Sequence, residues 1–217
     1  MITRFLQKEI EQELENDKIL IVLGPRQSGK TTLLKRISEK LEERGEQVHF
    51  YNFDRTNDLD FFKSQQKVEA FLKIRSIKQR MYIFIDEVQR MKNAGTFFKY
   101  FYDAGVNAKF IFSGSSSVEI KDEFGDALTG RKRVFTLLPL SLAEVAANTL
   151  GDEWIYAQAG DPQALEKFSQ LVETSLLWGN YPEVSTNALE EQKLKAIGEL
   201  YESYVQKDIK DLMRVKN

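Results

Sequence analysis

An apolar run, a glycine-bounded loop and a helical pattern follow one another without interruption between residues 19 and 41. The loop fills each fixed position of the pattern G-x-x-x-x-G-K-[ST] and reads Gly24-Pro25-Arg26-Gln27-Ser28-Gly29-Lys30-Thr31. Residues 19–23 precede it, and the pattern after it carries apolar residues at Leu33, Leu34, Ile37 and Leu41. Because these three parts coincide, the sequence predicts a β-strand joined to an α-helix by a tight glycine turn.

Such a turn has the chemistry of a polyphosphate site. Glycines let successive backbone N–H groups point inward, and the helix that follows adds the positive end of its dipole. We expect Lys30 to reach the β- and γ-phosphates, and the Thr31 hydroxyl to complete the shell of a Mg²⁺ ion that also keeps waters. The predicted nucleotide contacts are Gly24, Pro25, Arg26, Gln27, Ser28, Gly29, Lys30, Thr31 and Thr32.

The composition excludes several other classes of protein. The chain of 217 residues has 31 basic and 33 acidic side chains, so a net charge of −2 gives no global field toward nucleic acid or anionic membranes. It has no cysteine, which excludes disulfides and thiolate zinc sites. No apolar run approaches the roughly 20 residues of a membrane helix, and no signal-peptide pattern opens the chain. We therefore expect a cytoplasmic protein without a membrane segment.

Strand and helix patterns alternate along the chain, which is typical of a parallel sheet with helices on both faces. The predicted strands are residues 19–23, 47–53, 81–85, 109–112 and 134–138. The predicted helices are the one after the loop, which stops near Gly45, and those at about residues 67–78, 97–102, 141–150, 162–178 and from 188 onward. We expect an α/β domain over residues 1–140 and a smaller helical segment over 141–217.

A pair of acids ends the third predicted strand. Residues 81–85 form a continuous apolar run of the kind buried on both faces of a sheet, and Asp86 and Glu87 follow it. A carboxylate at this position can hold Mg²⁺ opposite Thr31, and the next acid can activate an attacking water. An exposed turn at the strand end is the alternative. Together with the loop, the pair predicts hydrolysis, with Asp86 at the metal and Glu87 as the base.

The order of the strands brings a hydroxyl to the same edge. A strand-helix unit separates the loop helix from the Asp86 strand, so right-handed crossovers can place residues 109–112 between the first and third strands. Ser113 follows that strand, at the edge where open α/β sheets bind ligands. We expect Ser113 to sense the γ-phosphate, with Ser115 as the second choice. A turn that caps the next helix is the alternative for either serine.

Several motifs in a fixed order resemble a prokaryotic AAA+ ATPase family, the AAA-domain ATP-binding proteins related to archaeal-type ATPases. They are Gly24-Pro25-Arg26-Gln27 with Gly29-Lys30-Thr31-Thr32, Ile85-Asp86-Glu87-Val88-Gln89, Phe112-Ser113-Gly114-Ser115-Ser116-Ser117, Gly130-Arg131, Leu138-Pro139-Leu140-Ser141, Gly179-Asn180-Tyr181-Pro182-Glu183 and Tyr204 with Asp208-Ile209. The resemblance covers most of the chain. The first motif is shared by phosphate-binding NTPases in general, and it is the set in this order that points to the family.

The resemblance implies an ATPase core with strand order 5-1-4-3-2, followed by a helical or winged-helix segment. It also implies ATP as the nucleotide, and the guanine-reading pattern Asn-Lys-x-Asp is missing after the late strands. Members of the family continue into a domain of restriction-endonuclease-like fold, which a chain ending at Asn217 is expected to lack.

An arginine that stabilises the transferring phosphoryl group is the remaining catalytic candidate. Arg131 matches the Gly-Arg of the family and is the first choice, supplied from a neighbouring copy or a flanking element. Residues 131–133 are also a short basic run of the kind that is solvated on a surface. A homo-oligomer, a protein partner and DNA all stay open as partners.

Other conspicuous residues predict structure rather than chemistry. His49 has no neighbouring Cys or His, so we expect no zinc, and the aromatic helix at 97–102 should pack on the sheet rather than stack bases. The sequence thus predicts a Mg²⁺-dependent ATPase. A nucleotide-held switch with little turnover is the alternative, and a small-molecule kinase ranks last because no arginine-rich lid follows.

Overall fold

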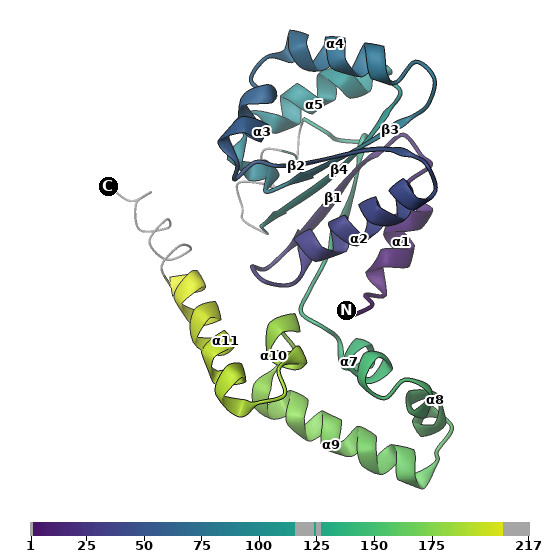
Figure 1. The fold of residues 1–217 in the computed structure, drawn as a ribbon, viewed down its shortest axis with the longest axis vertical. Coiled ribbons are helices and arrows are strands. Elements are labelled where there is room, and N and C mark those ends of the chain that lie inside the picture. The colour runs from purple at the N-terminus through teal and green to yellow at the C-terminus, as the bar shows by residue number, and fades with distance from the viewer. Residues whose placement is uncertain (1, 116–123, 125–126, 206–217) are drawn as a thin grey trace. The chain divides into compact units, whose positions relative to one another are not determined.

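The computed structural model describes residues 2–115, 124 and 127–205, which form two compact units (Figure 1). The α/β unit comprises Leu6–Gly24 and Lys30–Leu137. The helical unit comprises the described residues of Met1–Phe5, Pro25–Gly29 and Leu138–Asn217. Of the motifs in the sequence, Ser116-Ser117 and Asp208-Ile209 lie outside the described residues.

A five-stranded sheet forms the centre of the α/β unit. Its strands are β1 (Ile19–Gly24), β2 (Gln47–Asn52), β3 (Met81–Asp86), β4 (Ala108–Ser115) and β5 (Lys132–Thr136). Every pairing is parallel, and the order is β2-β3-β4-β1-β5. This confirms the expected α/β fold and the order 5-1-4-3-2. Because parallel neighbours need crossover connections, the helices between the strands are forced onto the faces of the sheet.

Helices cover both faces of this sheet (Figure 1). They are α1 (Leu6–Gln12) and α2 (Lys30–Glu43) on one face, and α3 (Thr56–Phe61), α4 (Gln65–Arg75) and α5 (Ala94–Asp103) on the other. Side chains of β1 alternate between the two cores, with Leu20 packed among residues of α1 and α2 and Ile21 among residues of α4 and α5. A strand buried on both faces explains the continuous apolar run at 19–23.

The aromatic helix packs against the sheet, as expected. Phe98 and Phe101 of α5 are fully buried, and the ring of Phe98 lies 4.6 Å from that of Phe112 on β4, centroid to centroid. These tilted contacts belong to one core that also holds rings from α3. Phe98 and Phe101 are therefore not available to stack bases, while Tyr100, which is 40% exposed, donates its hydroxyl to Glu69.

In the part of the helical unit that the structure describes, up to residue 205, five helices follow Leu137. They are α7 (Leu142–Thr149), α8 (Asp152–Gln158), α9 (Pro162–Trp178), α10 (Pro182–Thr186) and α11 (Glu190–Ser203). Ser141 and Glu144 form a capping box at the start of α7, and Asp161 caps α9, where Pro162 takes the first helical position. Among the described residues, no helix is both long enough and apolar enough to span a bilayer.

Some elements differ from the sequence-based expectation. The fifth strand begins two residues earlier than predicted, at Lys132, and ends at Thr136. It lies at the edge of the sheet, where exposed charged side chains are tolerated, so apolarity does not mark its start. The helix expected over residues 67–78 is α4, which begins at Gln65 and ends at Arg75. The sequence analysis missed α1, α3, α8 and α10, which are short, with at most seven residues each.

Candidate functional site

The carboxyl ends of β1, β3 and β4 meet at one edge of the sheet. Gly24 at the end of β1 lies opposite Ser115 of β4, and Ile85 of β3 lies opposite Phe112 of β4. Because neighbouring parallel strands end together, Asp86 and Ser113 come to the start of α2, which follows β1 through the glycine loop. The structure therefore brings together four of the predicted site residues in the α/β unit, namely Lys30, Thr31, Asp86 and Ser113.

Asp86 is the centre of this cluster. Its carboxylate is 2% exposed, and its two oxygens accept hydrogen bonds from two hydroxyls. Thr31 Oγ1 donates to Asp86 Oδ2 at 2.7 Å, and Ser113 Oγ donates to Asp86 Oδ1. A buried carboxylate needs such donors, since an unpaired charge in the interior is strongly unfavourable. The hydroxyls of α2 and β4 are thus fixed on one acid at the end of β3.

The loop between Gly24 and Lys30 has the backbone conformation of an anion-binding turn. Gln27 and Gly29 both have left-handed φ angles, at 57° and 93°, and a turn that alternates in this way directs successive N–H groups to one side. The Lys30 Nζ atom donates to the carbonyl of Gly24 at 2.9 Å. Ser28 is fully buried, yet its Oγ finds no partner among the described residues. This orphan hydroxyl and the inward amides suit an anionic ligand with oxygen acceptors.

Glu87 differs from Asp86 in both conformation and exposure. It follows β3 with φ 56° and ψ 44°, a left-handed conformation that is uncommon for a glutamate, and it begins the 3-10 helix η1 (Val88–Arg90). Its side chain is half-buried and accepts a hydrogen bond from Gln89 Nε2. The second acid thus sits in a left-handed turn, and the bond from Gln89 fixes the orientation of its carboxylate.

The remaining predicted contacts differ in exposure. Pro25 and Arg26 are half-buried, Gln27 is exposed, and Thr32 is exposed in the first turn of α2. Ser115 is half-buried at the end of β4, one strand residue beyond Gly114 and two beyond Ser113. Because side chains alternate along a strand, Ser113 and Ser115 share one face of the sheet, and it is Ser113 that contacts Asp86.

Arg131 lies at the opposite end of the strands. Its carbonyl accepts from Ile19 N at 2.9 Å, which places it beside the first residue of β1, whereas Gly24 ends that strand. Its guanidinium pairs with Asp103, at 2.6 Å from Nε to Oδ1, and lies 5.9 Å from the ring centre of Tyr102. The structure therefore does not bring Arg131 to the cluster of its own chain. A role toward the nucleotide of a neighbouring copy stays a prediction.

Two residues near the loop were missed by the sequence analysis. Arg4 donates from Nη1 to the carbonyl of Ser28 at 2.8 Å, and Arg4 Nε donates to Glu144 Oε1 at 3.0 Å. The spacing of Ser141 and Glu144, which is typical of a capping box, could have located Glu144 at a helix start. No local pattern identifies Arg4, because its partners lie 24 and 140 residues away.

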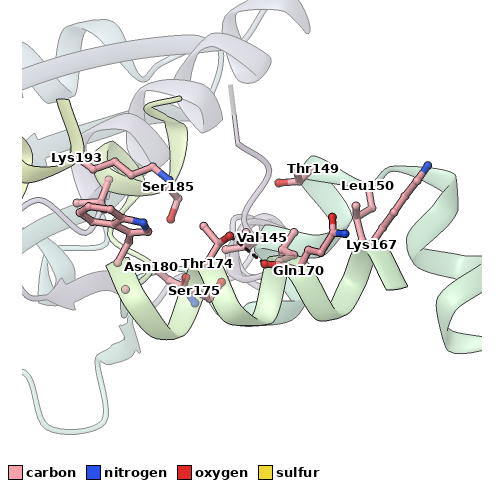
Figure 2. A pocket seen from close by; sticks show the side chains of 14 residues that line it. Val145, Thr149, Leu150, Lys167, Gln170, Thr174, Ser175, Asn180, Ser185 and Lys193 are labelled. Carbon is pink, nitrogen blue, oxygen red and sulfur yellow. Dashed lines mark hydrogen bonds between the residues drawn. The ribbon is translucent and has the colours of Figure 1, made fainter. Parts of the chain in front are cut away.

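A separate groove of about 470 Å³ runs along α9 within the helical unit (Figure 2). Lys167 and Lys193 lie at its opposite ends, with Gln170 and Thr174 between them. The Lys193 ammonium sits 5.5 Å from the ring centre of Trp178, and Lys167 pairs with Glu153. None of the predicted nucleotide contacts lines this groove, so it does not compete with the glycine loop as the phosphate site.

Two curated relatives match almost the whole of this chain. An uncharacterized protein of the archaeon Methanocaldococcus jannaschii is 24% identical over 216 residues, covering 99% of this chain and 47% of its own length. An uncharacterized protein of Haemophilus influenzae is 25% identical over 230 residues, covering 100% of this chain and 52% of its own length. The chain thus spans about half the length of the curated relatives it matches.

The fold has a counterpart among solved structures. The ORC1 protein of Aeropyrum pernix, solved in complex with DNA, superposes with a TM-score of 0.51 over 70% of this chain and 50% of its own, at 11% identity. An identity this low supports the shared P-loop NTPase fold alone. At the level of sequence, the model of the AAA domain matches residues 16–146, which include the loop, both acids and all five strands. The chain therefore belongs to the AAA-domain family of P-loop NTPases, as its motifs indicate.

Proposed function

We propose that this protein binds ATP with Mg²⁺ at the Gly24–Thr31 loop and hydrolyses it, and that turnover changes the conformation of attached elements or partners. One observation carries the proposal. A single buried carboxylate, Asp86, holds the hydroxyls of both Thr31 and Ser113 at the end of the strand that faces the loop helix. A phosphate-binding turn alone needs neither of these contacts, whereas nucleotide hydrolysis needs a metal ligand and a polar group at the γ-phosphate.

The residues present fit a magnesium ion. Thr31 and Asp86 supply hydroxyl and carboxylate oxygens, the hard donors that Mg²⁺ prefers, and they already lie 2.7 Å apart. Within the described part of the chain, no group of three or more His, Cys, Asp or Glu could hold a metal by itself. That agrees with an ion bound mainly through substrate phosphates and waters. When bound, Mg²⁺ neutralises the charge that develops on the β- and γ-oxygens.

The roles of the other side chains follow from their positions. Lys30 Nζ donates a hydrogen bond to the Gly24 carbonyl in this structure. In the proposed ATP complex the ammonium donates to the phosphates instead. Glu87 accepts the proton of the attacking water, and Gln89 orients that carboxylate. Ser113 contacts the γ-phosphate from the neighbouring strand.

A nucleotide-held switch with little turnover is the second candidate. The observation in its favour is the bond from Gln89 to Glu87, since a base engaged by a neutral amide is held away from a water. Glu87→Gln distinguishes the two functions. In an ATPase it preserves ATP affinity and lowers turnover by a factor of about 10² to 10⁴, the usual contribution of a general base. In a switch, the already slow turnover stays the same.

Phosphate release from ATP in the wild type, Glu87→Gln and Lys30→Ala tests the proposal. Lys30→Ala should abolish nucleotide binding, because it removes the ammonium expected at the β- and γ-phosphates. Gln79→Ala, in the α/β unit but bonded to Gly45 and Glu46, is the matched control and should turn over like the wild type. Hydrolysis that survives Glu87→Gln undiminished would remove that residue from the base role.

Two partners belong to the proposal: a neighbouring copy of the chain, to which Arg131 would contribute, and DNA, which is present in the structure of the fold neighbour ORC1. Turnover should be measured across protein concentration, with and without duplex DNA. If Arg131 acts on the nucleotide of a neighbouring copy, Arg131→Gln should remove the concentration-dependent part of the rate and leave the low-concentration rate unchanged. A rate per molecule that is constant at all concentrations would exclude this role.

A further inference from the structure

One buried arginine of the helical unit, Arg4, binds the backbone of the phosphate loop. Arg4 is 8% exposed, and each of its three guanidinium nitrogens donates to a different group. Nε donates to Glu144 Oε1 at 3.0 Å, Nη1 to the carbonyl of Ser28 at 2.8 Å, and Nη2 to the carbonyl of Leu138 at 2.6 Å. All four residues belong to the helical unit, which includes the segments Met1–Phe5 and Pro25–Gly29 besides the chain from Leu138 onward. One planar side chain therefore joins the first residues, the loop and the start of the helices.

The bond to Ser28 fixes a peptide plane at the tip of the loop. The carbonyl of Ser28 and the N–H of Gly29 belong to the same planar trans peptide and point in opposite directions. When Arg4 holds the oxygen on one side, the Gly29 amide is directed to the other side, away from the guanidinium. The left-handed φ of 93° at Gly29 sets how that amide continues into the turn. The orientation of an inward amide thus depends on an arginine that lies behind the loop.

Glu144 keeps Arg4 in place. It is 5% exposed and accepts from Phe5 N at 2.9 Å and Ser141 N at 2.9 Å, besides Arg4. Burial raises the pKa of Glu144, but the hydrogen bonds from Ser141, Phe5 and Arg4 outweigh it, so the pKa lies below its ordinary value. The carboxylate is ionised at neutral pH. The same acid therefore caps α7 and orients the guanidinium that holds the loop.

The start of α10 also lies near Gly29. A Cβ atom built on Gly29 would lie 3.7 Å from Pro182 Cγ and 3.8 Å from Arg4 Nη1. Pro182 is the first residue of α10, whose Val184 packs with Trp178 at the end of α9. The loop peptide is thus bonded to Arg4 through the Ser28 carbonyl and lies near the start of α10.

We propose that Arg4 is a positioning residue of the phosphate loop, which orients the Ser28–Gly29 peptide toward bound ATP and couples nucleotide binding to the order of the Arg4, Glu144 and α10 contacts. The inference rests on the proposed function, since it requires ATP at the loop. Arg4 touches no reacting atom, so its effect is on nucleotide affinity rather than on the chemical step.

Arg4→Lys tests the positioning role. Lysine keeps a positive charge beside Glu144, but its single ammonium cannot span three acceptors as the guanidinium fork does. We expect the Kd for Mg·ATP to rise about tenfold or more, the usual effect of losing a hydrogen bond from a charged donor. Arg80→Lys is the matched control, because Arg80 also holds carbonyls, those of Glu15 and Asn16, away from the loop. It should leave the Kd unchanged.

The outcomes separate this inference from the proposed function. If the wild type does not bind ATP, the function fails and the inference with it. If the wild type binds and Arg4→Lys binds equally well, only the inference fails. A purely structural role would lower the thermal midpoint of both lysine variants and leave both Kd values unchanged, which also refutes it.

Hydrogen exchange of the wild type decides the matter should Arg4→Lys fail to fold. ATP should slow exchange at the Phe5 amide, which is bonded to Glu144, and at the Ser185 amide of α10, which is bonded to the Tyr181 carbonyl. The Ser76 amide at the end of α4 serves as the reference and should be unaffected. Protection of the loop by ATP without any change at Phe5 or Ser185 would overturn the coupling.

Discussion

Replacing Thr31 with valine removes one hydroxyl and keeps the branched shape of the side chain. In the structure that hydroxyl donates to Asp86 Oδ2 at 2.7 Å, and the carboxylate is 2% exposed. A hydrogen bond to a charged group contributes about 1.5–3 kcal/mol, so the unfolding free energy should fall by about that amount. For a chain of this size the thermal midpoint should drop by roughly 3–12 °C. Thr31→Ser retains the hydroxyl and should lose less than about 0.5 kcal/mol.

The same substitution separates the structural role of Thr31 from its proposed role at the metal. With Mg²⁺ present, the variant loses a metal ligand, and its Kd for ATP should rise by about 10 to 150 times, which is 1.5–3 kcal/mol at 25 °C. With EDTA present, no metal is bound and the Kd for ATP should match that of the wild type. Isothermal titration at a temperature where both proteins are folded measures both values.

The comparison of the Kd for ATP with Mg²⁺ and with EDTA tests whether Thr31 acts through the metal. An equal loss of affinity with Mg²⁺ and with EDTA would mean that Thr31 acts on the loop geometry and not on the metal. A thermal midpoint equal to that of the wild type would mean that the contact between Thr31 and Asp86 contributes nothing to the fold. Thr31→Ser controls both readings, since it restores the oxygen without the methyl group.

Three further predictions concern stability. Phe98→Ala should lower the unfolding free energy by about 3–5 kcal/mol in urea denaturation, because the ring is fully buried between α5 and β4, and an unchanged midpoint would contradict its place in the core. The pKa of Glu144 is lowered in the folded protein, so its ionised carboxylate stabilises the fold above about pH 4.5, and this contribution is lost as the pH falls through the lower folded pKa. In denaturation curves at a series of pH values, Glu144→Gln should therefore lose less unfolding free energy at acidic pH than the wild type does. Burial lowers the pKa of Lys109 to about 7 from 10.5, so the unfolding free energy should decrease as the pH falls from 10.5 to 7, and a Lys109→Met variant with the same pH slope would refute this.

The sheet and the central cluster could be predicted because each depends on local patterns. The apolar runs at 19–23 and 81–85 mark strands buried on both faces, and the crossover rule then places the fourth strand between them. Asp86 and Ser113 follow from the ends of those strands. The edge strand was misplaced by two residues because Lys132 and Arg133 carry no apolar signal, although they pair with β1.

The contacts behind the loop could not be predicted in the same way. Arg4 meets Ser28 and Glu144 only after the chain has folded, and a single arginine near the chain start has no distinguishing neighbour. The same holds for Pro182. The motif Gly179–Glu183 contains this proline, but nothing in the motif indicates that Pro182 lies near Gly29 in the folded chain. Arg131 is a different case, since the topology places it at the amino end of the strands of its own chain, and the role that its Gly-Arg motif suggests toward a neighbouring copy stays a prediction.

The order of the strands has a consequence for synthesis on the ribosome. Both sheet neighbours of β1, β4 and β5, come after β2 and β3 in the chain, so the most apolar strand emerges long before either partner exists. At about 5–20 residues per second, on the order of ten seconds pass between the emergence of residue 24 and that of residue 115. During that interval the run Ile19–Gly24 has no strand to pair with, and it is the segment of the nascent chain where a chaperone would be expected to bind first.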